Sequence, residues 1–140
     1  MELNFISLRR LTMAVVPDMM KHQWGRIVNI SGKSEPPLRG IYGTNSSKAA
    51  VNGFSKGLSN ELGRCGITVN CIAPGKILTE QIRRKQNEQV RAKFAENIPV
   101  GRYGEPGELA RLAVFLASPG SGFITGTVIP VDGGLRRYAF

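Results

Sequence analysis

Residues 47–75 read SKAAVNGFSKGLSNELGRCGITVNCIAPG, and this stretch predicts a helix that leads into a buried strand. Its first part carries an apolar stripe at helical spacing, formed by Val51, Phe54, Leu58 and Leu62. We expect this helix to run from about residue 45 to residue 62, with Gly63 or Gly66 ending it. Residues 67–74 form a short apolar run rich in β-branched side chains, which is typical of a strand buried inside a parallel sheet.

The rest of the chain continues this alternation of helices and strands. Sequence patterns predict helices over residues 3–20, 79–97 and 108–117, and strands over residues 25–31 and 127–134. Pro17 could kink the first helix, and Pro130 places the last strand at a sheet edge or at a strand end. Strands that alternate with helices imply right-handed crossovers, so we expect an α/β fold with a parallel sheet covered on both faces.

The predicted sheet is small for a complete domain. A parallel sheet of three strands leaves an edge uncovered, so the chain looks like part of a larger fold. We therefore expect residues 1–140 to form a single, partial domain.

Composition narrows the classes of function. The 140 residues are 41% hydrophobic but contain no apolar run long enough to span a membrane, which is typical of a soluble globular protein. The N-terminus lacks the pattern of a secretory signal, so we expect a cytoplasmic location. His22 is the only histidine, and neither Cys65 nor Cys71 belongs to a Cys/His cluster. We therefore expect neither a metal centre nor a Ser-His-Asp hydrolase.

The chain is basic, with a net charge of +9 and basic clusters at residues 9–10, 83–85 and 136–137. Such clusters can bind nucleic acid, but no nucleic-acid-binding motif is present and the aromatic residues do not alternate with the basic ones. A solvated basic face, or one that meets an acidic partner, is the favoured interpretation.

Four stretches together resemble the C-terminal part of a short-chain dehydrogenase/reductase: GRIVNIS (residues 25–31), residues 47–80, IPVGRYGEPGELARLAVFLAS (residues 98–118) and ITGTVIPVDGG (residues 124–134). Within that family the chain is most similar to 3-oxoacyl-acyl-carrier-protein reductases. The resemblance implies a Rossmann-like parallel sheet, an NADP or NAD cofactor, hydride transfer between nicotinamide and a carbonyl or alcohol, and a homo-oligomer. The family's glycine-rich phosphate-binding half is absent, and we interpret residues 120–126, GSGFITG, as a turn.

The resemblance also implies catalytic residues. Asn4 stands where the family has an asparagine that holds a water in a proton relay, although it could be only a polar residue at a helix start. Lys48 matches the lysine that bonds the nicotinamide ribose and lowers the pKa of a catalytic phenol. The family usually has its carbonyl-polarising serine where this chain has Gly32, so we assign that role to the adjacent Ser31, which could instead only end the strand; Ser34 is close by.

The catalytic tyrosine is displaced from its usual place. The family pattern is Tyr, three residues, Lys, because positions i and i+4 share a helical face and the ammonium stabilises the phenolate. Four residues before Lys48 stands Thr44, whose aliphatic hydroxyl is far too weak an acid for this role. Tyr42, two residues earlier, could reach the site if the helix starts after it; otherwise it is an ordinary loop tyrosine.

The stretch APGKILTE, residues 73–80, matches the family's cofactor loop through Pro74, Gly75, Ile77 and Thr79. The resemblance implies that this loop meets the nicotinamide carboxamide; an ordinary strand-to-helix loop is the alternative. The charged helix that follows would cover the substrate, and its basic residues are Arg83, Arg84, Lys85, Arg91 and Lys93. They suit an acidic acyl carrier protein or a CoA phosphate, but a solvated helix explains them equally well.

Three functions remain open. The first is an NAD(P)-dependent reductase of small-molecule or acyl-carrier-bound carbonyl substrates, represented by its C-terminal portion. The second is a catalytically inactive relative that serves as an oligomerisation partner. The third, a nucleic-acid binder, is the least favoured and would show affinity that falls steeply with salt.

Overall fold

The computed structural model describes residues 1–32 and 43–136. The helices are α1 (Ser7–His22), α2 (Gly43–Leu62), α3 (Glu80–Lys85), α4 (Glu88–Ala95) and α5 (Pro106–Ala117), and a π-helical turn, Glu2–Ile6, precedes α1. The strands are β1 (Gly25–Ile30), β2 (Ile67–Pro74) and β3 (Val128–Val131). Short 3-10 turns occur at Gly63–Cys65 and Pro119–Ser121.

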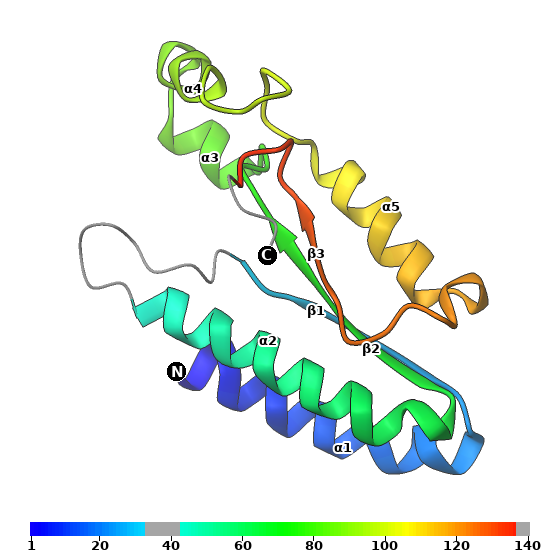
Figure 1. The fold of residues 1–140 in the computed structure, drawn as a ribbon. Coiled ribbons are helices and arrows are strands. Elements are labelled where there is room, and N and C mark those ends of the chain that lie inside the picture. Colours follow the sequence, from blue (N-terminus) through cyan, green and yellow to red (C-terminus); the bar gives the residue numbers. More distant parts are fainter. Residues whose placement is uncertain (33–42, 137–140) are drawn as a thin grey trace.

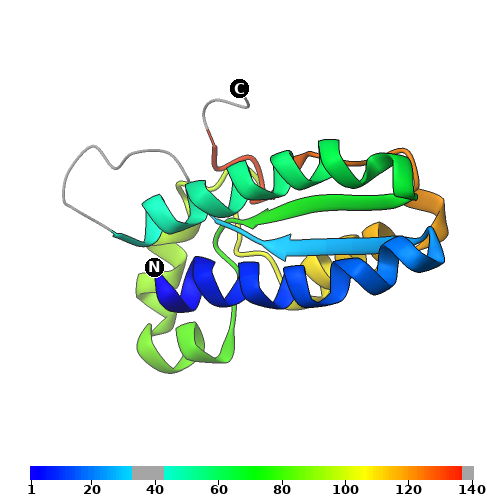
Figure 2. The same ribbon diagram turned by 90° about the horizontal axis from the view of Figure 1, so that it is seen from below.

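The three strands form one parallel sheet in the order β1-β2-β3 (Figure 1). β1 pairs with β2 from Gly25↔Ile67 to Ile30↔Ile72, and β2 pairs with β3 from Cys71↔Val128 to Pro74↔Val131. Helices α1 and α2 lie side by side on one face, and α5 covers the other face (Figures 1 and 2). The predicted Rossmann-like parallel α/β architecture is confirmed.

Burial distinguishes the central strand from its neighbours. Every residue of β2 from Ile67 to Ala73 is buried, as the sequence predicts for a central parallel strand. In β1, by contrast, buried and partly exposed residues alternate, and Ile30 is exposed. Within the described residues β1 pairs only with β2, so one of its edges is open. β3 also pairs only with β2 there, which agrees with the edge position predicted from Pro130.

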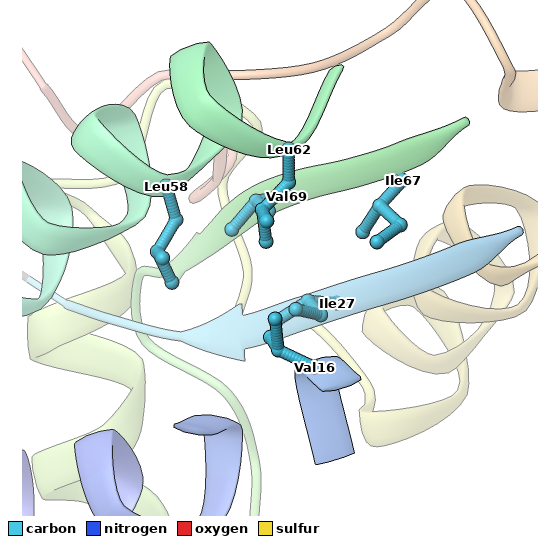
Figure 3. Close-up of a cluster of buried hydrophobic side chains, with 6 residues drawn as sticks. All are labelled: Val16, Ile27, Leu58, Leu62, Ile67 and Val69. Carbon is cyan, nitrogen blue, oxygen red and sulfur yellow. The ribbon is translucent and has the colours of Figure 1, made fainter. Parts of the chain in front are cut away.

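An apolar cluster fills the space between the sheet and the α1–α2 layer (Figure 3). Its buried members are Val16, Ile27, Leu58, Leu62, Ile67 and Val69. Burying a side chain of this size contributes about 1.5–3 kcal/mol, so the cluster holds both helices on the sheet. The predicted stripe of α2 thus faces the core through Leu58 and Leu62.

A tight junction lies between the end of α1 and the start of β2. Gly66 has φ +69°, and a Cβ added there would lie 2.3 Å from the Gln23 carbonyl oxygen. Only glycine combines this backbone conformation with so close an approach. Gly66 was one of two glycines expected to end the preceding helix, and the structure adds its contact with Gln23.

The charged segment after β2 is two helices rather than the single one predicted over residues 79–97. Asn87 begins the second helix, because its side chain accepts a 2.9 Å hydrogen bond from the Val90 amide. An N-cap asparagine adopts an extended backbone, which interrupts the preceding helix. α1 continues through Pro17 to His22, and α5 begins at Pro106, ahead of the predicted residue 108. In the two described ranges, no helix combines the length and apolar character needed to cross a membrane.

Candidate active site

Parallel pairing brings the carboxyl ends of all three strands to one edge of the sheet. Ser31 follows β1 there, Pro74 ends β2, and Asp132 follows β3. In open parallel α/β sheets, ligands bind outside the carboxyl ends of the strands. This edge, which we call the carboxyl edge, is therefore the candidate site.

Ser31 is buried at this edge, with 4% of its surface exposed. Its amide donates a 2.8 Å hydrogen bond to the Ile72 carbonyl, which fixes its backbone to β2. Its side-chain oxygen has no hydrogen-bond partner within the described residues. Leaving a buried hydroxyl unpaired costs about 1–3 kcal/mol, so the Ser31 hydroxyl is suited to bonding a ligand oxygen.

Lys48 reaches the same place from the second turn of α2. Its Nζ donates a 2.8 Å hydrogen bond to the carbonyl oxygen of Ile30, the residue before Ser31. The Lys48 stem passes close to Gly32, since a Cβ added to Gly32 would lie 3.5 Å from Lys48 Cγ. The structure therefore brings a lysine close to the buried Ser31 at the end of β1.

Asn4 lies on the π-helical turn Glu2–Ile6 and is partly buried. The sequence predicted an ordinary helix here, so this turn is a correction. The neighbouring Phe5 packs edge-to-face on Phe54, with ring centroids 5.8 Å apart, which holds the turn against α2. The start of the chain thus lies beside the helix that carries Lys48 (Figure 2). π-helical turns are rare and are frequent at functional sites.

Tyr42 and Ser34 lie outside the described residues. The described part of α2 begins at Gly43, earlier than predicted, and includes the backbone of Thr44. Thr44 thus precedes Lys48 by one turn within the helix, and the use of Tyr42 as proton donor stays a prediction.

The four predicted cofactor-loop residues form one connected turn after β2. Gly75 donates a 2.9 Å hydrogen bond to the Val131 carbonyl, and a Cβ added to Gly75 would lie 2.5 Å from Asp132 Cβ. Ile77 forms an isolated parallel bridge with Gly104. Thr79 caps α3 by accepting a 3.4 Å hydrogen bond from the Ile82 amide. The close approach of β3 therefore explains the glycine, and helix capping accounts for the threonine.

Several basic side chains over this loop have partners. Arg83 pairs with Glu105 at 3.4 Å, and Arg84 pairs with Glu80. Lys76 Nζ lies 5.4 Å from the centroid of the Phe94 ring, a distance that permits a cation–π contact. The Arg83 and Lys76 contacts join α3 and α4 to neighbouring segments, whereas the Arg84 pair lies within α3. Together they leave less free positive charge than the sequence suggests.

The pKa values of two further side chains, Glu108 and Cys71, are shifted from their usual values. Hydrogen bonds from the Arg102 guanidinium and the Glu105 amide lower the pKa of Glu108 to about 2, so this carboxylate is ionised at neutral pH. Burial raises the pKa of the Cys71 thiol, although a hydrogen bond with Ser55 and the charge of Lys48 oppose this effect. Cys71 is therefore protonated at neutral pH and is poorly suited to act as a nucleophile.

Arg136 is the site residue that the sequence missed. Its guanidinium donates a 3.1 Å hydrogen bond to the carbonyl oxygen of Gly32, across the carboxyl edge from β3 to β1. In the sequence Arg136 counted only as part of a basic pair. The available signal was an aspartate, Asp132, four residues earlier and two intervening glycines, which together indicate a structured turn rather than a free tail.

Comparison with known proteins identifies the family. A family model described as enoyl-(acyl carrier protein) reductase matches residues 1–136. The 3-oxoacyl-[acyl-carrier-protein] reductase of Chlamydia trachomatis is 45% identical over 135 residues, which cover 94% of this chain and 53% of that protein. The acetoacetyl-CoA reductase of Shinella zoogloeoides is 42% identical over 132 residues, covering 94% of this chain and 55% of that protein.

A solved structure shows the same arrangement of elements. The gluconate 5-dehydrogenase of Burkholderia cenocepacia, in complex with NADP and tartrate, superposes with a TM-score of 0.87 at 34% identity. The match covers 96% of this chain and 54% of that one. The chain therefore belongs to the short-chain dehydrogenase/reductase family. It resembles the 3-oxoacyl-[acyl-carrier-protein] reductases within it, and it spans about half the length of the curated relatives it matches.

The residues at the carboxyl edge fit one end of a nicotinamide cofactor. Lys48 and the irregular loop after β2 offer polar groups to a nicotinamide and its ribose. The described residues offer no comparable site for the cofactor pyrophosphate, because among them no glycine-rich turn follows a strand and opens a helix. Residues 120–126 lead into β3, as the predicted turn would.

Proposed function

We propose that this chain carries the catalytic end of an NAD(P)-dependent reductase that acts on the carbonyl of a 3-oxoacyl thioester. The observation that carries the proposal is the buried hydroxyl of Ser31 beside Lys48 at the carboxyl edge, which has no hydrogen-bond partner among the described residues. A hydroxyl donor placed where a carbonyl oxygen gains negative charge is a recurring device for stabilising that charge.

Each predicted residue has a role in this proposal. Ser31 donates its hydroxyl proton to the substrate carbonyl oxygen in a hydrogen bond, and Tyr42 is the proton donor. Lys48 lowers the pKa of that phenol and bonds the nicotinamide ribose, and Asn4 holds a water that leads protons to Lys48. A nicotinamide cofactor, when bound, supplies the hydride.

The loop of Pro74, Gly75, Ile77 and Thr79 would hold the nicotinamide carboxamide. Two of its groups are partly used, since the Gly75 amide bonds Val131 and the Thr79 oxygen caps α3. The Thr79 hydroxyl still has its proton to donate, because capping uses it only as an acceptor. Thr79 is therefore the member of the loop best able to bond a carboxamide oxygen.

The names of the relatives support the substrate class. By their names, these relatives reduce acyl groups carried on an acyl carrier protein or on CoA. Both carriers hold the acyl group on an arm that contains phosphate, and basic side chains on a helix suit such an arm. Arg83 and Arg84 already meet acidic neighbours, so in this proposal they help less than Lys85 and Lys93. A homo-oligomer is proposed as its assembled form.

A second function is favoured by a separate observation. Large apolar side chains are exposed on α1 (Leu11, Met13, Val15 and Met20) and around the end of α5 (Val114, Phe115 and Phe123). Exposed apolar groups on two helices suit contact with another protein surface. An inactive relative that serves as an oligomerisation partner would use these groups without any turnover.

A calorimetric titration with NADPH and NADH, followed by turnover of a 3-oxoacyl thioester, separates the two functions. Saturable cofactor binding with turnover supports the reductase. A folded chain that binds neither cofactor and turns nothing over contradicts the reductase proposal. If that chain also associates in analytical ultracentrifugation, the oligomerisation partner is the better description.

A further inference from the structure

The Arg136 side chain links the two outer strands of the described sheet at the carboxyl edge. Its Nη2 donates to the Gly32 carbonyl oxygen at 3.1 Å, although 104 residues separate the two in sequence. β1 and β3 do not pair with each other, because β2 lies between them. The hydrogen bond therefore joins two segments that are not strand neighbours.

A compact turn after β3 holds this arginine in place. Asp132 accepts hydrogen bonds from the amides of Gly134, at 3.0 Å, and of Arg136, at 3.3 Å. The Arg136 Nε also lies 3.7 Å from the Asp132 carboxylate, and the two side chains are only 21% and 8% exposed. Gly133 and Gly134 have φ of +63° and +82°, which glycine adopts without strain.

This turn restricts the conformations of the Arg136 side chain independently of its hydrogen bond to Gly32. The same carboxylate holds its backbone amide and faces its guanidinium, so few rotamers remain to be lost. The planar guanidinium faces the Asp132 carboxylate with its Nε and donates to the Gly32 carbonyl through its Nη2. A lysine, with one charged nitrogen, could not span both partners in this way.

The segment that Arg136 meets is the one that carries Ser31. Lys48 donates to the carbonyl of Ile30, and Arg136 donates to the carbonyl of Gly32. The carbonyls on either side of Ser31 are thus both held by cations. The Ser31 amide is held as well, by the Ile72 carbonyl, so the backbone that presents the Ser31 hydroxyl is fixed at three consecutive residues.

We propose that Arg136 is a positioning residue, which acts through Gly32 to hold the Ser31 hydroxyl where the substrate carbonyl binds. The inference rests on the proposed reductase function and adds a residue to that site. A displacement of about 1 Å in a catalytic group can cost roughly 100-fold in rate, so a contact of this kind can matter without touching substrate.

The test compares Arg136→Gln and Arg136→Lys with Arg26→Gln, a matched control at the opposite edge of the sheet. Arg26 also donates to backbone carbonyls, those of Gly25, Gly66 and Ser118, but lies at the start of β1. Amide hydrogen exchange at Ser31 and the kcat and KM for a 3-oxoacyl thioester are measured in each folded variant.

We expect Arg136→Gln to speed exchange of the Ser31 amide about 10-fold and to lower kcat about 10-fold, with KM within about twofold of the wild type. For Arg136→Lys, the Ser31 exchange rate and kcat should lie between those of the wild type and Arg136→Gln. Lysine keeps the positive charge but lacks the several N–H donors of the planar guanidinium. Arg26→Gln should speed exchange near the start of β2 and leave Ser31 exchange and kcat unchanged.

Two results would overturn the inference: unchanged Ser31 exchange in Arg136→Gln, or faster exchange with unchanged kcat. If Arg136→Gln does not fold, the same comparison is made with Arg136→Lys. Failure of the reductase function itself is recognised separately, because the wild-type chain would then show no turnover. In that case Ser31 exchange alone decides whether Arg136 holds this segment.

Discussion

Arginine side chains have different roles at the carboxyl edge and at the opposite edge, where the three strands begin and which we call the amino edge. At the amino edge, Arg26 donates to the carbonyls of Gly25, Gly66 and Ser118 and lies 5.1 Å from the Trp24 ring centroid. At the carboxyl edge, Arg136 donates to Gly32, next to the Ser31 hydroxyl, which has no hydrogen-bond partner among the described residues. The first network closes a junction between elements, whereas the second fixes the backbone beside the hydroxyl that we propose binds the substrate carbonyl.

An unpaired hydroxyl alone does not mark a site. Thr68, at the second position of β2, also has a buried side-chain oxygen without a partner among the described residues. It pairs in register with Arg26, close to the amino edge. What distinguishes Ser31 is the adjacent Lys48 and the carboxyl-edge position, so the contrast between these two hydroxyls is a direct test of the assignment.

The largest effect is expected for Lys48→Met in the active assembly. Removing this ammonium should lower kcat for carbonyl reduction by about 1000-fold, because acid catalysis by the phenol depends on it. Steady-state kinetics measure the loss. Lys56→Met, two turns further along α2, is the control and should keep wild-type kcat; equal losses in both variants would contradict the assignment of Lys48.

The next largest effect is expected from removing one of the two buried hydroxyls, that of Ser31 or that of Thr68. Ser31→Ala should lower kcat about 100-fold, since it removes the donor to the carbonyl oxygen. Thr68→Val removes an equally buried hydroxyl from the other edge and should leave kcat unchanged. Both should raise the free energy of unfolding by up to ~1–2 kcal/mol, because each removes a buried polar group that has no partner among the described residues. Urea unfolding measures the second effect, and loss of turnover in Thr68→Val alone would reverse our assignment of the edges.

Gly66→Ala should disrupt the contact between Gly66 and the Gln23 carbonyl at the amino edge without affecting the carboxyl edge. Its Cβ would meet the Gln23 carbonyl oxygen at 2.3 Å with φ at +69°, so we expect a loss of roughly 2–3 kcal/mol in unfolding free energy. Urea denaturation gives the value, and Gly63→Ala is the control, because a Cβ there meets nothing within 4 Å. A Gly66→Ala protein as stable as Gly63→Ala would show that this junction is not tight.

The smallest effect concerns pH. The pKa of Glu108 is lowered from 4.5 to about 2 by its hydrogen bonds with Arg102 and the Glu105 amide. A lowered folded-state pKa stabilises the fold above the unfolded value, so this contribution is present above about pH 4.5 and is lost as pH falls toward 2. Glu108→Gln should therefore reduce the change in thermal unfolding temperature across that interval. An unchanged pH profile would show that the pair does not survive in solution.

Much of the fold was predictable because it depends on local periodicity. The stripe of α2, the apolar run of β2 and the glycines around them indicated a parallel α/β sheet. The division between α3 and α4 was missed because one side chain, that of Asn87, decides it. The π-helical turn at Asn4 was missed because its sequence looks like an ordinary helix, and its packing through Phe5 on Phe54 is tertiary.

The sequence by itself determined the family resemblance, the alternation of helices and strands, and Ser31 and Lys48 as candidates. Only the tertiary structure decided that these two meet at the end of β1, that Gly75 is required by Asp132, and that Arg136 reaches Gly32. The physical reason is separation along the chain. Periodicity reports which side of an element is apolar, whereas a hydrogen bond between residues 104 positions apart exists only once β2 has spaced the outer strands.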